Sequence, residues 1–132
     1  MEWGVNVFLS VSNLTKSYHN GITTQVLKGV NMELQKGHIG VILGPSGSGK
    51  STLMNIIGGV DRADGGMVKV DDLQITGLSD DQLVEYRRDS VGFIFQFYNL
   101  VPNLTVAENV EVVSNRIDPL ILDKNSRILS FS

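Results

Sequence analysis

The segment Gly44-Pro45-Ser46-Gly47-Ser48-Gly49-Lys50-Ser51 holds the residues whose types and spacing point most directly to chemistry. It matches the phosphate-loop pattern G-x-x-x-x-G-K-[ST] at every fixed position. Its glycines allow successive backbone N–H groups to point inward as a nest for an anion, and a helix beginning near Gly49 adds about half a positive charge. In this pattern Lys50 reaches the β- and γ-phosphates of a nucleotide, and the Ser51 hydroxyl coordinates Mg²⁺.

The flanks of this segment decide between a nucleotide site and a glycine-rich turn that matches the pattern by chance. Residues 39–43 are continuously apolar, which predicts a buried strand before the loop. Leu53, Ile56 and Ile57 have the spacing of one helix face after it. This context favours a nucleoside triphosphate site. Its expected binding residues are Gly44, Ser46, Gly47, Ser48, Gly49, Lys50, Ser51 and Thr52, with Thr52 placed to bond the α-phosphate.

The elements that must position the loop are predicted from periodicity. Residues 8–44 indicate strands, and Asn20-Gly21 between two such runs is a typical hairpin turn. Residues 26–34 alternate, with a break at Lys28 that a strand near an edge allows. The remaining expected elements are a helix stop at Gly58-Gly59, a strand at residues 68–70 with a turn at Asp71-Asp72, a helix of about two turns after a Ser79/Gln82 capping box, a second buried strand at residues 91–95, and a helix through Val110 after a Thr105/Glu108 capping box. This order predicts an α/β fold.

Composition excludes several classes of protein. The 132 residues contain no Cys and two His, so neither a disulfide framework nor a thiolate zinc site is expected. A net charge of −3 gives no electrostatic reason to expect nucleic acid as a partner. The apolar runs are far shorter than the roughly 20 residues of a membrane-crossing helix. We therefore expect a cytoplasmic chain with no direct membrane insertion.

Three separate runs resemble the ATP-binding subunits of ABC transporters, most of all those serving permeases of the lipoprotein-release and macrolide-export type. They are GPSGSGKSTL at residues 44–53, GFIFQ at residues 92–96 and LVPNLTVAENV at residues 100–110. The resemblance covers residues 9–112. It implies a P-loop NTPase core with an N-terminal antiparallel β subdomain, with ATP and Mg²⁺ as cofactors.

The resemblance also implies roles for two residues outside the loop. Tyr18 corresponds to the aromatic residue that stacks on adenine; the alternative is a strand-end tyrosine half-buried against Val26. Gln96 corresponds to the glutamine that contacts Mg²⁺ and the attacking water, so Lys50 and Gln96 are the expected catalytic residues and Ser51 and Gln96 the expected metal contacts. The alternative for Gln96 is a polar strand terminus. An apolar cluster that follows is either core or the groove that receives a permease helix: Phe97, Tyr98, Leu100, Val101 and Leu104.

The sequence also departs from the family pattern. It has no L-S-G-G-Q signature, no four apolar residues followed by Asp-Glu (Walker B), and no His after the phosphate loop. The nearest look-alike, residues 68–72, contains Lys69 within the strand. We therefore expect an incomplete fold, truncated before the signature and Walker B segments. Residues 1–113 are expected to form the N-terminal part of the ATP-binding domain, and residues 114–132 a divergent tail.

The function predicted from these features is that of an ATP-binding subunit, or a fragment of one, that energises transport by a partner permease. Its expected partners are the permease and a second ATP-binding subunit, and its expected place is the cytoplasmic face of the cell membrane. Because general-base and transition-state contributions are missing, the chain alone is expected to bind rather than hydrolyse ATP. The alternative is a non-catalytic nucleotide-binding or regulatory module. A GTPase is disfavoured because no N-K-x-D or T-K-x-D segment is present, and a DNA-repair ATPase because no zinc-binding or coiled-coil insertion is visible.

Overall fold

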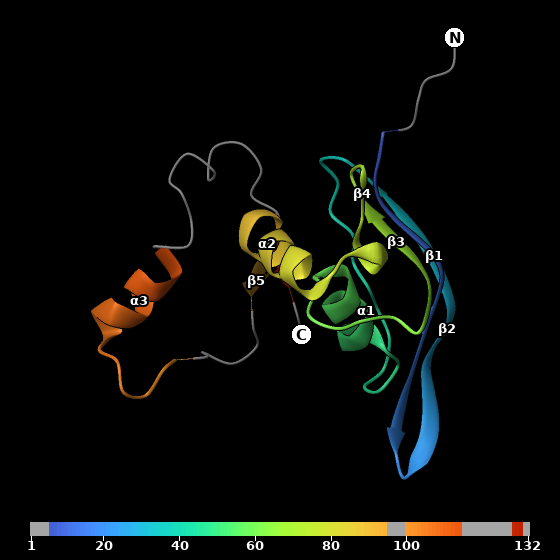
Figure 1. The fold of residues 1–132 in the computed structure, drawn as a ribbon, viewed down its shortest axis with the longest axis horizontal. Coiled ribbons are helices and arrows are strands. Elements are labelled where there is room, and N and C mark those ends of the chain that lie inside the picture. Colours follow the sequence, from blue (N-terminus) through green and yellow to red (C-terminus); the bar gives the residue numbers. More distant parts are fainter. Residues whose placement is uncertain (1–5, 95–99, 115–127, 131–132) are drawn as a thin grey trace. The chain divides into compact units, whose positions relative to one another are not determined.

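The computed structural model describes residues 6–94, 100–114 and 128–130, and the chain divides into two compact units, Met1–Leu83 and Val84–Ser132. The elements of the first unit are β1 (Val7–Asn20), β2 (Ile22–Gln35), α1 (Lys50–Ile57), β3 (Gly65–Val70), β4 (Leu73–Gln74) and the 3-10 helix η1 (Ile75–Gly77) (Figure 1). Helix α2 (Asp80–Ser90) begins in the first unit and ends in the second. The second unit also holds β5 (Gly92–Ile94), α3 (Val106–Ser114) and β6 (Ile128–Ser130).

The sheet of the first unit is antiparallel, with the strand order β2-β1-β3-β4. The predicted hairpin is confirmed, because Asn20 pairs with Ile22 and Gly21 supplies the positive φ of +79° at the turn. The turn predicted at Asp71-Asp72 is also confirmed. It joins β3 to β4, and Asp71 has a φ of +56°. Both turns are fixed by residues next to one another in the chain.

A bulge at Gly29 explains why Lys28 interrupts the apolar alternation of β2. Leu14 pairs with Val30, but the next residue of β1, Thr15, pairs with Lys28, which leaves Gly29 without a partner at a φ of +88°. One extra residue moves the following side chains to the opposite face of a strand. Leu27 is consequently buried and Lys28 exposed. The break that sequence periodicity attributes to an edge position is therefore a register shift on an edge strand.

The core lies between the sheet and α1. Its most deeply buried side chains are Leu14 of β1, Ile56 of α1 and Val68 of β3. The helix stop is confirmed, because the Gly58 amide bonds to Met54 O at 2.8 Å and Gly59 has a φ of +73°. Helix α1 is thus a short element whose apolar face is anchored on the sheet and whose N-terminus carries the phosphate-loop motif.

The strand predicted at residues 39–43 is wrong. These residues form no strand, and Ile39, Val41 and Leu43 are 93%, 75% and 86% exposed. A continuously apolar strand needs a neighbour on each side and a cover on both faces. Among the residues that the structure describes, the strands of the first unit pair only in antiparallel fashion with one another. Residues 39–43 therefore have the sequence of a central strand without the neighbours that would bury it.

In the second unit, the predicted strand at residues 91–95 is found only as β5, which pairs in parallel with β6. Its predicted burial is wrong for Ile94, which is 52% exposed, and Phe95 lies outside the described residues.

Both capping boxes are confirmed by reciprocal hydrogen bonds, at 2.9 and 3.3 Å for Ser79/Gln82 and at 2.7 and 3.2 Å for Thr105/Glu108. The helices that they open, α2 and α3, are longer than predicted.

Candidate nucleotide-binding site

The phosphate-loop motif runs directly into the first turn of α1, as the sequence predicts. Gly49 is the N-cap of α1 with a left-handed φ of +92°, and Gly47 has a φ of +79°. A Cβ at Gly49 would lie 3.0 Å from the Val26 carbonyl oxygen, so the loop also packs closely against β2. The left-handed φ favours glycine at both positions, and the close contact with β2 adds to this demand at Gly49.

Two polar groups of the loop form hydrogen bonds within the loop itself. The Ser48 amide donates to Pro45 O at 3.2 Å, and the Lys50 ammonium donates to Gly44 O, so the lysine side chain reaches back across the loop. Ser51, in the first turn of α1, is exposed. That turn contains no acidic residue, and Gly49 offers no side-chain cap. The N-terminal amides of α1 and one ammonium group therefore lie together without a carboxylate from the same turn.

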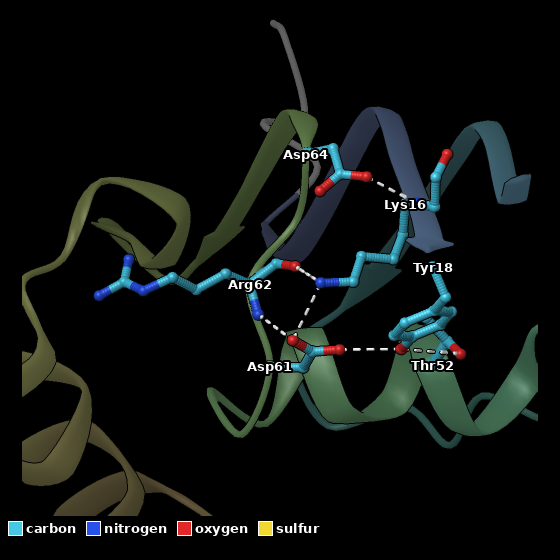
Figure 2. A network of polar contacts seen from close by, with 7 residues as sticks. Lys16, Tyr18, Thr52, Asp61, Arg62 and Asp64 are labelled. Carbon is cyan, nitrogen blue, oxygen red and sulfur yellow. Dashed lines mark hydrogen bonds and ion pairs between the residues drawn. The ribbon is translucent and has the colours of Figure 1, made fainter. Parts of the chain in front are cut away.

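Tyr18, predicted to contact a base, lies beside the phosphate loop's own helix (Figure 2). Its Oη is 2.8 Å from Asp61 Oδ2 and 3.4 Å from Thr52 Oγ1. The Lys16 ammonium is 5.2 Å from the centre of the Tyr18 ring, within cation–π range. The structure thus brings together two predicted site residues, Tyr18 and Thr52, that are 34 positions apart in the chain.

Asp61 joins these groups. Its Oδ1 accepts from the Lys16 ammonium at 3.0 Å and from the Arg62 amide at 2.8 Å, and its Oδ2 accepts from Tyr18. Burial opposes the charged form of Asp61, but the hydrogen bonds from Lys16, Tyr18 and the Arg62 amide outweigh it and lower the pKa of the carboxyl below its usual range. Asp61 is therefore a carboxylate at neutral pH and the counterion of Lys16, whose side chain is only 12% exposed.

The turn that carries Asp61 is tied to β1 by further bonds. Asp64 Oδ2 accepts from the Ser17 amide at 2.6 Å, the Asp64 amide donates to Thr15 O at 2.9 Å, and Lys16 donates to Arg62 O at 2.6 Å. No residue of this turn is among the site residues predicted from the sequence. The one signal in the sequence is that Lys16 and Tyr18 are two positions apart on a predicted strand, which places both side chains on the same face but does not connect them to Asp61.

The other predicted residues are distributed as follows. Gln96, Phe97 and Tyr98 lie outside the described residues. Leu100 and Val101 are 63% and 47% exposed, which does not fit a core role for these two. Among the described residues no group of three or more His, Cys, Asp or Glu side chains is placed to hold a metal ion. No helix in the described ranges is both long and apolar enough to cross a bilayer.

Comparison with known proteins identifies the family of this chain. The family model for the ABC transporter matches residues 27–131. The chain belongs to the ABC transporter family. It is 51% identical over 108 residues to an ABC transporter ATP-binding protein of Mycoplasma pneumoniae, with 81% of this chain and 23% of that protein covered. It is 42% identical over 105 residues to the macrolide export ATP-binding/permease protein MacB of Marinobacter nauticus, with 79% and 16% covered.

A solved structure gives the same ABC assignment. The dimeric, post-hydrolysis structure of the ATP-binding cassette MJ0796 bound to ADP and Pi superposes with a TM-score of 0.73 at 45% identity, covering 79% of this chain and 45% of that one. This confirms the predicted P-loop NTPase fold, and the chain is part of an ABC transporter ATP-binding domain. It spans less than half the length of each of these three proteins.

Proposed function

We propose that the chain binds Mg-ATP through residues 44–52, as the part of an ABC ATP-binding subunit that holds the nucleotide phosphates. The observation that carries the proposal is the placement of Lys50 across a loop whose left-handed glycines, Gly47 and Gly49, lead into the N-terminus of α1. Backbone amides at such a terminus form an anion site. Membership of the ABC transporter family supports ATP as the ligand.

Each loop residue has a role in this proposal. The amides of Ser46, Gly47 and Gly49 face the phosphates, the Ser48 amide exchanges the Pro45 carbonyl for a phosphate oxygen, and Gly44 leaves room for the loop to close. The Lys50 ammonium exchanges the Gly44 carbonyl for β- and γ-phosphate oxygens. Thr52 bonds the α-phosphate. These are binding and orienting roles, which neutralise charge on the phosphates without a covalent step.

The residues present also fit a magnesium ion of the kind that nucleotides carry. Mg²⁺ usually keeps several waters and is held by one or two protein oxygens together with substrate phosphates, whose charge it neutralises. The exposed Ser51 hydroxyl is such an oxygen. Gln96 is the second proposed contact to Mg²⁺ and to an attacking water, and with Lys50 it forms the proposed catalytic pair. Tyr18 is proposed to stack on the adenine base.

The assembly that we propose is a pair of ATP-binding subunits attached to a membrane permease at the cytoplasmic face of the cell membrane. Two findings on relatives support it. The MJ0796 cassette is dimeric in its solved structure, and MacB is named as both ATP-binding and permease protein. Transport energised by ATP is proposed as the function of this assembly.

Equilibrium binding tests the proposal. Mg-ATP should bind the chain, and Lys50→Ala should abolish binding at the same concentrations, because charge-assisted bonds to phosphate are lost. Lys28→Ala, on the exposed side of β2, is the matched control and should bind as the parent chain does. Retention of full affinity by Lys50→Ala would contradict the proposed site. Steady-state phosphate release that Lys50→Ala abolishes would exclude a purely regulatory module.

A further inference from the structure

The ion pair between Lys16 and Asp61 lies outside the phosphate loop yet contacts both Tyr18 and the turn after α1. Its partners are close, at 3.0 Å, and Lys16 is largely buried. An ammonium that is mostly shielded from water needs compensation, which Asp61 and the Arg62 carbonyl supply. Exposed ion pairs contribute little to stability. The pair of Lys16 and Asp61 differs from these because the Lys16 side chain is largely shielded from solvent.

The pair holds the Tyr18 ring at two points. Asp61 Oδ2 accepts the phenolic hydrogen at 2.8 Å, and the Lys16 ammonium lies over the ring at 5.2 Å from its centre. The hydroxyl end and one ring face are therefore engaged by groups of the chain itself. Tyr18 is only partly buried, and a ring fixed in this way loses little conformational entropy when a ligand stacks on it.

The same contacts reach the phosphate side. Tyr18 has one hydroxyl hydrogen, and its shorter contact is to the charged oxygen of Asp61, so at the 3.4 Å contact the Thr52 hydroxyl is the donor. Thr52 belongs to α1, directly after the motif's Ser51. Asp61 is thus linked through one tyrosine to a residue proposed to bond the α-phosphate. Because this last contact is long, it restrains Thr52 only weakly.

From this geometry we infer that Lys16 and Asp61 are positioning residues for a flat nucleotide base, which fix the Tyr18 ring as a stacking platform next to the phosphate loop. The inference rests on the proposed function, in which Tyr18 stacks on the base, and adds the two residues that fix this ring. Neither residue contacts the ligand itself. Their effect is therefore confined to ligands that carry a base and is transmitted through Tyr18.

The test compares ATP with inorganic tripolyphosphate, both with Mg²⁺, on the 132-residue chain. Asp61→Asn should weaken ATP binding by about fivefold, because the ring loses its anchor and Lys16 its counterion. Tripolyphosphate, which has no base, should bind within about twofold of the parent chain. Asp80→Asn is the matched control, since it removes an ion pair of 2.6 Å with Arg62 but contacts neither Tyr18 nor Thr52; ATP affinity should not change.

A second set of variants separates positioning from general stability. Tyr18→Leu should weaken ATP binding by about tenfold through loss of stacking. Asp61→Asn added to Tyr18→Leu should cause no further loss, because its effect passes through the ring. Tyr18→Phe, which removes only the hydroxyl, should weaken binding of ATP but not of tripolyphosphate, as is expected for Asp61→Asn. This variant decides the matter if Asp61→Asn does not fold.

The outcomes are distinct. Equal weakening of both ligands by Asp61→Asn, or an additive loss in the double variant, would overturn the inference. Unchanged ATP affinity in Tyr18→Phe or Tyr18→Leu would also overturn it. In that case, loss of tripolyphosphate binding in Lys50→Ala would still support the proposed phosphate site. A parent chain that binds neither ligand would overturn the proposed function, and this inference with it.

Discussion

The phosphate loop with α1 and the segment just before it, residues 39–43, show opposite relations between sequence and structure. The loop takes the conformation that its glycines predict, and α1 buries Leu53, Ile56 and Ile57 as expected. The preceding segment has a strand's sequence but exposes Ile39, Val41 and Leu43. The loop and helix depend on neighbours along the chain and on one hairpin. A parallel central strand depends on partners distant in sequence.

The largest effect should separate two leucines on the two sides of this comparison. Leu14→Ala, at a fully buried position, should lower the free energy of unfolding by about 2–5 kcal/mol, because it leaves a cavity between sheet and helix. Leu43→Ala, at an exposed position, should change it by less than about 0.5 kcal/mol. Urea denaturation measures both. Similar losses from the two variants would show that residues 39–43 are packed and would remove the contrast.

The next effect tests whether the loop's shape is set by its glycines. Gly49→Ala should destabilise the chain by about 2 kcal/mol or more, because a left-handed φ is combined with contacts of 3.0 Å to Val26 and Leu27. Gly37→Ala has a similar φ of +80° with nothing within 4 Å, so it should cost only the backbone part, about 1 kcal/mol. Thermal unfolding measures the stability of both variants. A larger loss of stability in Gly37→Ala than in Gly49→Ala would contradict close packing of the loop on β2.

A smaller effect concerns the locally determined start of α2. Ser79→Ala should cost about 1 kcal/mol, because the Gln82 amide loses its capping acceptor. Ser79→Asp should restore most of the loss, since aspartate caps as well as serine. Amide hydrogen exchange at residues 80–83 measures the fraying. Protection that is the same in all three chains would mean that tertiary contacts alone fix this helix.

The smallest effect is a dependence on pH. The folded-state pKa of Asp61 lies below its ordinary value, so its contribution to stability is present above about pH 4 and is lost as pH falls through the lowered value. The difference in melting temperature between the parent chain and Asp61→Asn should therefore shrink on acidification below about pH 4. A difference that stays constant down to pH 2 would indicate that the carboxylate is not stabilised by Lys16 and Tyr18.

The sequence predicts the elements that depend on chain neighbours, but not those that depend on partners distant in sequence. The hairpin at Asn20-Gly21, both capping boxes and the stop at Gly58-Gly59 are short-range patterns, and all are found. The strand at residues 39–43 and the burial of Ile94 depend on a larger parallel sheet, and they fail.

The network of Lys16, Asp61 and Tyr18 was missed for a related reason. Asp61 is 45 residues from Lys16 and 43 residues from Tyr18, and no local pattern connects a lysine of β1 to an acidic turn after α1. Only the pairing of β1 with β3 brings the turn beside Tyr18. The motif therefore revealed the phosphate side of the candidate site, while the base side required the fold.

The most direct test of the central claim, that the amides of this loop bind polyphosphate, is two-dimensional NMR of the ¹⁵N-labelled chain. Adding Mg-ATP, and separately Mg-tripolyphosphate, should shift the amide signals of Gly47, Gly49 and Lys50, while those of the hairpin tip around Gly21 stay in place. Lys50→Ala should show no such shifts at the same ligand concentrations. Unchanged signals throughout residues 44–52 at saturating ligand would contradict the account.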